Sequence, residues 1–66
     1  MLITINGEPR EVREGITLKN LLLELEINTR GTAVEINREI VPRASHNERL
    51  VAEGDVIEII RMVGGG

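Results

Sequence analysis

The chain contains no cysteine, phenylalanine, tryptophan or tyrosine in its 66 residues. Without cysteine, neither a disulfide nor a thiolate metal site can stabilise so short a chain. Without aromatic residues, the core has to consist of leucine, isoleucine and valine. A chain of this length buries only about 60% of its unfolded surface, and its core rarely supplies more than about 3–5 kcal/mol. The sequence therefore predicts one helix on one sheet, with little room for an internal active site.

Short apolar runs separated by turn residues predict a β-hairpin over residues 2–13. Asn6-Gly7 is a strong hairpin signal, because both residues tolerate the positive φ of a type I′ turn. Pro9 suits an edge strand or the first residue of the return strand.

Leucines at helical spacing predict one amphipathic helix over residues 18–25. Thr17 is the expected N-cap, and Leu23 lies off the apolar stripe. The residues of the stripe, at i, i+3, i+4 and i+7, are Leu18, Leu21, Leu22 and Leu25.

Three further strands are expected over residues 32–36, 40–41 and 56–62. The connector over residues 43–52 has no clear period, and Leu50 is expected to fill part of the core. Because the last strand follows a long connection, it can lie beside the first strand in the middle of the sheet. The expected fold class is α+β, a β-grasp with a mixed sheet packed on one main helix.

The predicted domain organisation is a β-grasp domain over residues 1–62 and a flexible glycine tail over residues 63–66. The tail ends in three consecutive glycines, Gly64-Gly65-Gly66, directly after a predicted strand. Glycine has no Cβ, so such a tail is slim, and its four residues reach roughly 13 Å when extended. It could thread a channel in a partner and present its terminal carboxylate there. The alternative is a frayed terminus, as in most short tails.

Composition argues against several other functions. The net charge of −3 and the lack of aromatic residues disfavour nucleic acid. No apolar run approaches the ~20 residues of a membrane span, and no signal peptide is apparent, so the expected location is cytoplasmic. The single histidine, His46, cannot form a metal site alone, and Ser45 beside it is not expected to act as its nucleophile. No catalytic residue, metal site or cofactor bound by the chain itself is expected.

The last predicted strand also suggests a docking surface. Glu58 is costly to bury unpaired, so its face of the sheet should be the open one, which leaves Ile60 and Met62 partly exposed beside the tail. Neighbouring exposed apolar residues indicate a partner-docking patch, although single exposed apolar residues are also ordinary. Basic residues that could steer a charged partner are Arg38, Arg43 and Arg61.

The remaining chemical group is the α-carboxylate of Gly66. A carboxylate is a poor acyl donor, so its activation needs a mixed anhydride such as an acyl-adenylate made with ATP. Side chains near the end would obstruct entry into an adenylating site, and glycines remove that obstruction.

The sequence resembles the ThiS family of sulfur carriers in thiamine biosynthesis over its whole length. The most specific stretches are residues 31–37 (Gly-Thr-Ala-Val-Glu-Ile-Asn) and 40–43 (Ile-Val-Pro-Arg). Residues 53–55 (Glu-Gly-Asp) and an apolar strand leading into Gly65-Gly66 complete the resemblance.

The resemblance implies a ubiquitin-like fold and a sulfur-transfer cycle. A ThiF-like adenylating enzyme would use ATP and magnesium to adenylate Gly66. Sulfur supplied through a cysteine desulfurase would then leave a thiocarboxylate on Gly66, which the thiazole synthase ThiG would use. Gly65 would be the slim neighbour that channel entry requires, and Gly64 would loosen the tail.

Other functions remain open from the residues alone. Within the same class are the small subunit of molybdopterin synthase, whose chains tend to be longer and to carry aromatic residues, and carriers of other sulfur pathways. A ubiquitin-like modifier would attach Gly66 to a lysine of a target. The last alternative is a structural β-grasp module with an inert tail.

Overall fold

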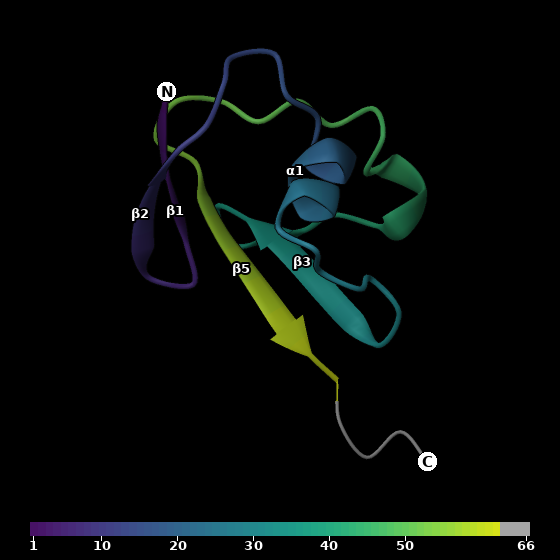
Figure 1. Ribbon diagram of the computed structural model, residues 1–66. Coiled ribbons are helices and arrows are strands. Elements are labelled where there is room, and N and C mark those ends of the chain that lie inside the picture. Colours follow the sequence, from purple (N-terminus) through teal and green to yellow (C-terminus); the bar gives the residue numbers. More distant parts are fainter. Residues whose placement is uncertain (63–66) are drawn as a thin grey trace.

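The computed structural model describes residues 1–62; the predicted tail, residues 63–66, lies outside this part. Figure 1 shows one sheet with α1 packed against it. The strands are β1 (Leu2–Ile5), β2 (Glu8–Glu11), β3 (Thr32–Ile36), β4 (Glu39–Ile40) and β5 (Val56–Arg61). The helices are α1 (Leu18–Glu24) and the 3-10 turn η1 (Arg43–Ser45). The five strands lie in the order β2-β1-β5-β3-β4, which confirms the predicted α+β class with a mixed sheet.

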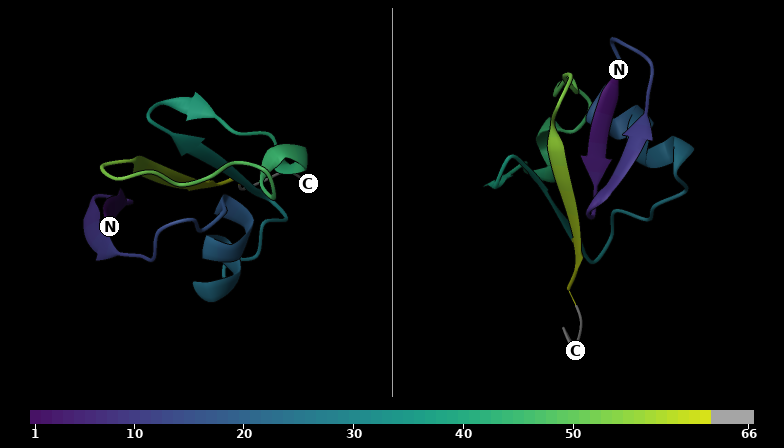
Figure 2. Two further views of the ribbon diagram at one scale, coloured as in Figure 1. Left: turned by 90° about the horizontal axis from the view of Figure 1, so that it is seen from above. Right: turned by 90° about the vertical axis from the view of Figure 1, so that its left-hand side faces the viewer.

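The last strand occupies the centre of the sheet, as predicted. β5 runs parallel to β1, with Ile5 opposite Ile57, and antiparallel to β3, with Ile36 opposite Ile57. Ile57 is fully buried between these neighbours. In the left view of Figure 2, α1 lies on one side of the sheet, and the alternating burial along β5 leaves the other side open.

The first hairpin forms at the predicted turn but is shorter than predicted. Asn6 and Gly7 both have positive φ, 49° and 84°, as a type I′ turn requires. β2 begins at Glu8 and ends at Glu11, so the prediction that it extends to residue 13 is wrong. Beyond Glu11 the edge strand keeps two further bonds: the amide of Val12 donates to the carbonyl of Met1 at 2.8 Å, and the N-terminal ammonium of Met1 donates to the carbonyl of Val12 at 2.7 Å.

Helix α1 begins as predicted and ends one residue early. The hydroxyl of Thr17 accepts a hydrogen bond from the amide of Asn20 at 3.2 Å, which confirms the N-cap. The helix ends at Glu24 because Glu26 adopts a left-handed conformation, with φ 58°. The amide of Ile27 then donates to the carbonyl of Leu22 at 3.0 Å, the long bond of a Schellman C-cap.

The core is aliphatic, as the composition required, but one predicted member is wrong. Leu50 is 58% exposed, and the adjacent Val51 is buried in its place. Leu50 forms an isolated antiparallel bridge with Thr17, so the backbone is extended there. Successive side chains of an extended backbone point to opposite sides, and therefore Val51 faces the core while Leu50 faces away from it. The buried core consists of Ile3, Ile16, Leu18, Leu21, Leu22, Val34, Ile36, Val41, Val51 and Ile57. No helix within residues 1–62 is long and apolar enough to cross a bilayer.

Candidate functional site

The predicted tail begins where the central strand leaves the sheet. β5 remains paired to its last residue, with Arg61 opposite Thr32, and the amide of Met62 still donates to the carbonyl of Gly31 at 2.8 Å. In Figure 1 the arrowhead of β5 lies at the end of the sheet remote from the N-terminus. The site predicted at Gly64, Gly65 and Gly66 lies outside the described residues.

The two faces of β5 differ as the sequence predicted. Ile57 is buried under α1 and Ile59 is half-buried, whereas Glu58 is exposed on the opposite face. Ile60 is 44% exposed and Met62 is 61% exposed. The exposure of both residues is confirmed, and their contact with a partner stays a prediction.

The strand register places further apolar residues on this open face. Ile60 lies opposite Ala33 of β3, Val56 lies opposite Thr4 of β1, and residues opposite one another share a face of the sheet. The strand register and the alternation along β5 assign five large exposed apolar residues to the open face of the sheet. They are Leu2, Ile40, Val56, Ile60 and Met62. We call this set the open-face patch. Sequence reasoning named Ile60 and Met62 as the exposed pair and placed Val56 on their face by alternation, whereas Leu2 and Ile40 join them only through the strand register.

Two carboxylates lie in the middle of the open-face patch. Glu35 of β3 is directly opposite Glu58 of β5, and Ile40 of β4 is opposite Glu35 on its other side. The ion pairs found within residues 1–62 join Met1 to Glu11 and Arg13 to Glu24, so neither of the two facing acids is neutralised by a described residue. An apolar surface with an acidic centre complements a partner that is apolar with a basic centre.

The basic residues predicted to steer a partner are not gathered in one place. Arg38 lies in the turn between β3 and β4, Arg43 begins η1, and Arg61 ends β5. Arg61 lines a hollow of about 620 Å³ at the end of the sheet, together with Arg30 and Met62. Of the three predicted arginines, Arg61 is therefore the one that lines this hollow, with Arg30 beside it.

His46 has a structural role in the part of the chain that is described. Its side chain is buried, and Nε2 lies 3.0 Å from the carbonyl oxygen of Val41. Because a carbonyl only accepts, Nε2 carries the proton of this bond. Among residues 1–62, no group of histidine, aspartate and glutamate side chains is placed to hold a metal ion.

The turn before β5 contains a second buried polar residue. One carboxylate oxygen of Asp55 accepts from the amide of Ala52 at 2.8 Å, and the other accepts from Nδ2 of Asn37 at 3.0 Å. The side-chain oxygen of Asn37 in turn accepts from the amide of Val56 at 3.0 Å. These bonds fix the start of β5 against the β3–β4 turn. Sequence reasoning predicted only a turn at both places.

Comparison with known proteins gives a consistent result. The family model described as "ThiS family" matches residues 3–66. The sulfur carrier protein ThiS of Thermus thermophilus is 37% identical over 65 residues, which cover 98% of this chain and 100% of that protein. The sulfur carrier protein ThiS of Escherichia coli is 33% identical, with 100% of both chains covered.

Structural comparison agrees with the sequence comparison. The crystal structure of the thiamine biosynthesis protein ThiS of Geobacter metallireducens superimposes with a TM-score of 0.90, at 32% identity and with 100% of both chains covered. The thiazole synthase of Paramagnetospirillum magneticum is 44% identical over 66 residues, and the chain spans only 20% of that protein's length. The chain spans 20% of the thiazole synthase of Magnetococcus marinus as well. With a family match over residues 3–66 and a closely superimposable structure, the chain belongs to the ThiS family.

Proposed function

We infer that this member of the ThiS family is a sulfur carrier of thiamine biosynthesis, and we propose that the sulfur is carried on the carboxylate of Gly66. The observation that carries the proposal is the match to the ThiS family over residues 3–66, which includes the final glycine. As a carrier, the protein is a co-substrate of its partners and not an enzyme. The thiocarboxylate is the activated form that a sulfur-using enzyme consumes.

The chemistry requires an activating partner. A ThiF-like enzyme with ATP and magnesium joins the Gly66 carboxylate to AMP and releases pyrophosphate. A persulfide derived from a cysteine desulfurase attacks the acyl carbon, and AMP leaves. Reduction of the remaining sulfur–sulfur bond by a thiol frees the thiocarboxylate. The chain has no cysteine, so none of its side chains can hold the sulfur as a persulfide.

The geometry of the described residues supports delivery of the tail into a partner. The open-face patch continues along β5 to Met62, the last described residue. A partner that docks on this face would hold the domain by a rigid, five-stranded sheet beside its own active site. Gly64 and Gly65 would pass through the channel without steric obstruction.

A thiazole synthase is the proposed acceptor of the sulfur. A segment similar to the whole of this chain lies within the thiazole synthases of Paramagnetospirillum magneticum and Magnetococcus marinus. A carrier segment and a thiazole synthase that share one polypeptide have a high effective concentration for one another. This supports a partnership of the separate chain with a ThiG-type enzyme.

The proposal is tested by extending the chain with one tryptophan after Gly66. The variant should keep the far-ultraviolet circular dichroism spectrum and the unfolding midpoint of the parent chain. It should nevertheless fail to release pyrophosphate with a ThiF-like enzyme, ATP and magnesium, because the Gly66 carboxylate is now a peptide bond and the indole beside the new terminal carboxylate obstructs channel entry. Pyrophosphate release at the parent rate would contradict the threading of the tail.

A further inference from the structure

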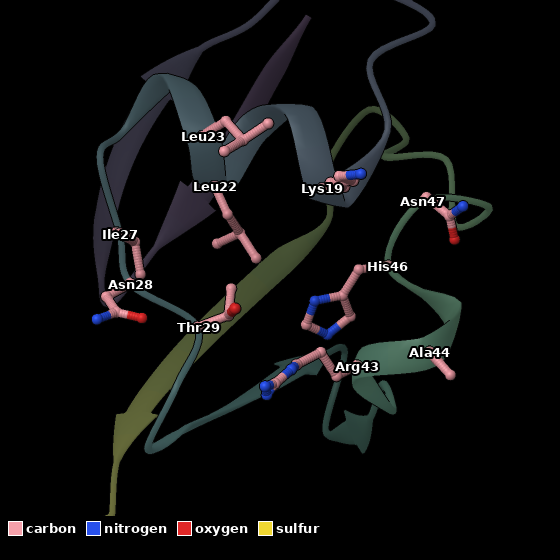
Figure 3. A pocket seen from close by; sticks show the side chains of 10 residues that line it. All are labelled: Lys19, Leu22, Leu23, Ile27, Asn28, Thr29, Arg43, Ala44, His46 and Asn47. Atoms are coloured by element: carbon pink, nitrogen blue, oxygen red, sulfur yellow. The ribbon is translucent and has the colours of Figure 1, made fainter.

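A groove on the helix side of the molecule is unused by the proposed function. It has a volume of about 580 Å³ and lies between α1 and the segment that contains η1. In Figure 3, Lys19, Leu22 and Leu23 of α1 border it on one side, with Arg43 and His46 on the other. None of the open-face patch lines it. Both surfaces can therefore be occupied at the same time.

The walls of the groove are held together by main-chain hydrogen bonds. The amide of Lys19 donates to the carbonyl of His46 at 2.9 Å, and the amide of Leu18 donates to the carbonyl of Arg49 at 2.8 Å. The next amide, of Asn20, is satisfied by the hydroxyl of Thr17. The first turn of α1 thus has no free amide to offer a ligand here, so any charge in the groove comes from its side chains.

Leucine and isoleucine side chains give the groove an apolar surface. Leu22 is buried, Ile27 is half-buried, and Leu23 is 63% exposed at the rim. His46 is buried, and its Nε2 bonds the carbonyl oxygen of Val41. Figure 3 shows this ring turned toward the middle of the groove. A ligand in the groove can therefore meet the apolar surface of Leu23 and Ile27.

The charge of the groove is opposite to that of the whole chain. Lys19 and Arg43 line it, and no aspartate or glutamate does, although the chain has 11 acidic residues and 8 lysines and arginines. Neither Lys19 nor Arg43 takes part in the ion pairs found among the described residues. Two cations without a neutralising acid beside an apolar surface complement an anionic group attached to an apolar one.

We propose that this groove binds a short acidic segment of a protein partner. One carboxylate of the segment pairs with Arg43, since a guanidinium binds a carboxylate in a bidentate manner, and a second carboxylate pairs with the ammonium of Lys19 on the other wall. A neighbouring apolar side chain of the segment covers Leu23 and Ile27. A free inorganic anion fits less well, because it would leave this apolar surface in water. The inference does not depend on the chemistry at Gly66.

The test is a titration of the isotope-labelled chain with the peptide acetyl-Glu-Leu-Glu-Leu-amide, followed by nuclear magnetic resonance of the backbone amides. Saturable shifts should be confined to the two walls, around Lys19, Leu23 and Arg43. The double variant Lys19→Glu, Arg43→Glu should weaken binding by about tenfold or more, because attraction becomes repulsion. The matched control Arg10→Glu changes an exposed arginine outside the groove and should bind as the parent chain does.

Two further ligands distinguish an acidic-segment site from a purely apolar site and from a site for free anions. The neutral peptide acetyl-Gln-Leu-Gln-Leu-amide should bind at least about tenfold more weakly than the acidic one. Inorganic phosphate at equal concentration should shift the same amides far less. Equal binding of either ligand, absent shifts with the acidic peptide, or full binding by the folded double variant would overturn the proposal. Equal binding of phosphate would show that the groove is a site for free anions. Each of the other outcomes would show that it is not a site for an acidic segment.

Discussion

Glu35 of β3 lies directly opposite Glu58 of β5 in the open face of the sheet. Like charges that face one another across two strands destabilise the sheet. Apolar neighbours surround them, with Ile40 opposite Glu35 and Ile60 two residues along β5 from Glu58. This pairing of carboxylates lowers the stability of the isolated domain, and it favours the binding of a partner that carries a basic residue at this place.

Removing one of these charges should stabilise the domain. Glu58→Gln is expected to raise the free energy of unfolding by about 0.2–1 kcal/mol, because the repulsion across β3 and β5 disappears. The midpoint of urea unfolding measures it. Glu39→Gln is the matched control, since Glu39 lies opposite Ile36 and should change stability less. A lower midpoint for Glu58→Gln would show that the two carboxylates do not repel one another in the folded chain.

Adjacent leucines of α1 should respond very differently to truncation. Leu22 is buried in the core, whereas Leu23 is exposed. Leu22→Ala should cost about 2–5 kcal/mol, comparable to the whole stability expected of a core this small. Leu23→Ala should stay within about 0.5 kcal/mol of the parent. Thermal unfolding followed by circular dichroism distinguishes them, and similar losses for both would contradict the helix orientation.

Glycine should be preferred to glutamate at the end of α1. Glu26 has φ 58°, and a side chain in this left-handed conformation costs about 1–2 kcal/mol. Glu26→Gly is therefore expected to stabilise the folded chain, offset in part by the extra freedom of glycine in the unfolded state. Glu24→Gly, at the last helical residue, should instead destabilise it by roughly 1 kcal/mol, because glycine is a poor helix former and the ion pair with Arg13 is lost. Urea unfolding of both variants measures whether the free energy of unfolding rises for Glu26→Gly and falls for Glu24→Gly. A lower free energy of unfolding for Glu26→Gly would contradict the left-handed C-cap at Glu26.

The buried carboxylate of Asp55 should be needed for folding. Asp55→Ala removes the acceptors of the Ala52 amide and the Asn37 side chain. Hydrogen bonds to a charged group contribute about 1.5–3 kcal/mol, so the loss should fall near the upper end of this range. Urea unfolding measures the cost. Glu48→Ala, at an exposed position, serves as the control, and equal midpoints for the two variants would contradict the role of Asp55.

A charge placed in the open-face patch should weaken the activating complex. Ile60→Arg is expected to reduce affinity for a ThiF-like enzyme by about tenfold or more, because a buried contact becomes an unpaired charge. Leu50→Arg adds the same charge at an exposed apolar residue outside the patch and should leave affinity unchanged. Isothermal titration calorimetry compares them. Unchanged affinity of a folded Ile60→Arg chain would remove the patch from the interface.

Local sequence signals predicted most of the fold because they act within a few residues. Asn6-Gly7 specified its turn through backbone angles, and Thr17 specified the start of α1 through one hydrogen bond. The alternation of β5 predicted the exposure of Ile60. Each of these features depends on neighbours in the chain and on no distant contact.

The errors arose where distant segments decide the outcome. Whether Leu50 or Val51 faces the core depends on the bridge between residues 17 and 50, which no local period reveals. The wider open-face patch and the pairing of Glu35 with Glu58 depend on strand register. The groove beside Lys19 and Arg43 exists only because the connector folds back on α1.

The central claim is that the terminal carboxylate at Gly66 carries the sulfur. Its most direct test is the intact mass of the chain after incubation with a ThiF-like enzyme, ATP, magnesium, a cysteine desulfurase, cysteine and a thiol reductant. The mass should rise by the difference between one sulfur and one oxygen atom, and fragmentation should place the increase on Gly66. An unchanged mass with an enzyme that activates an authentic ThiS in parallel, or an increase located elsewhere in the chain, would contradict the account.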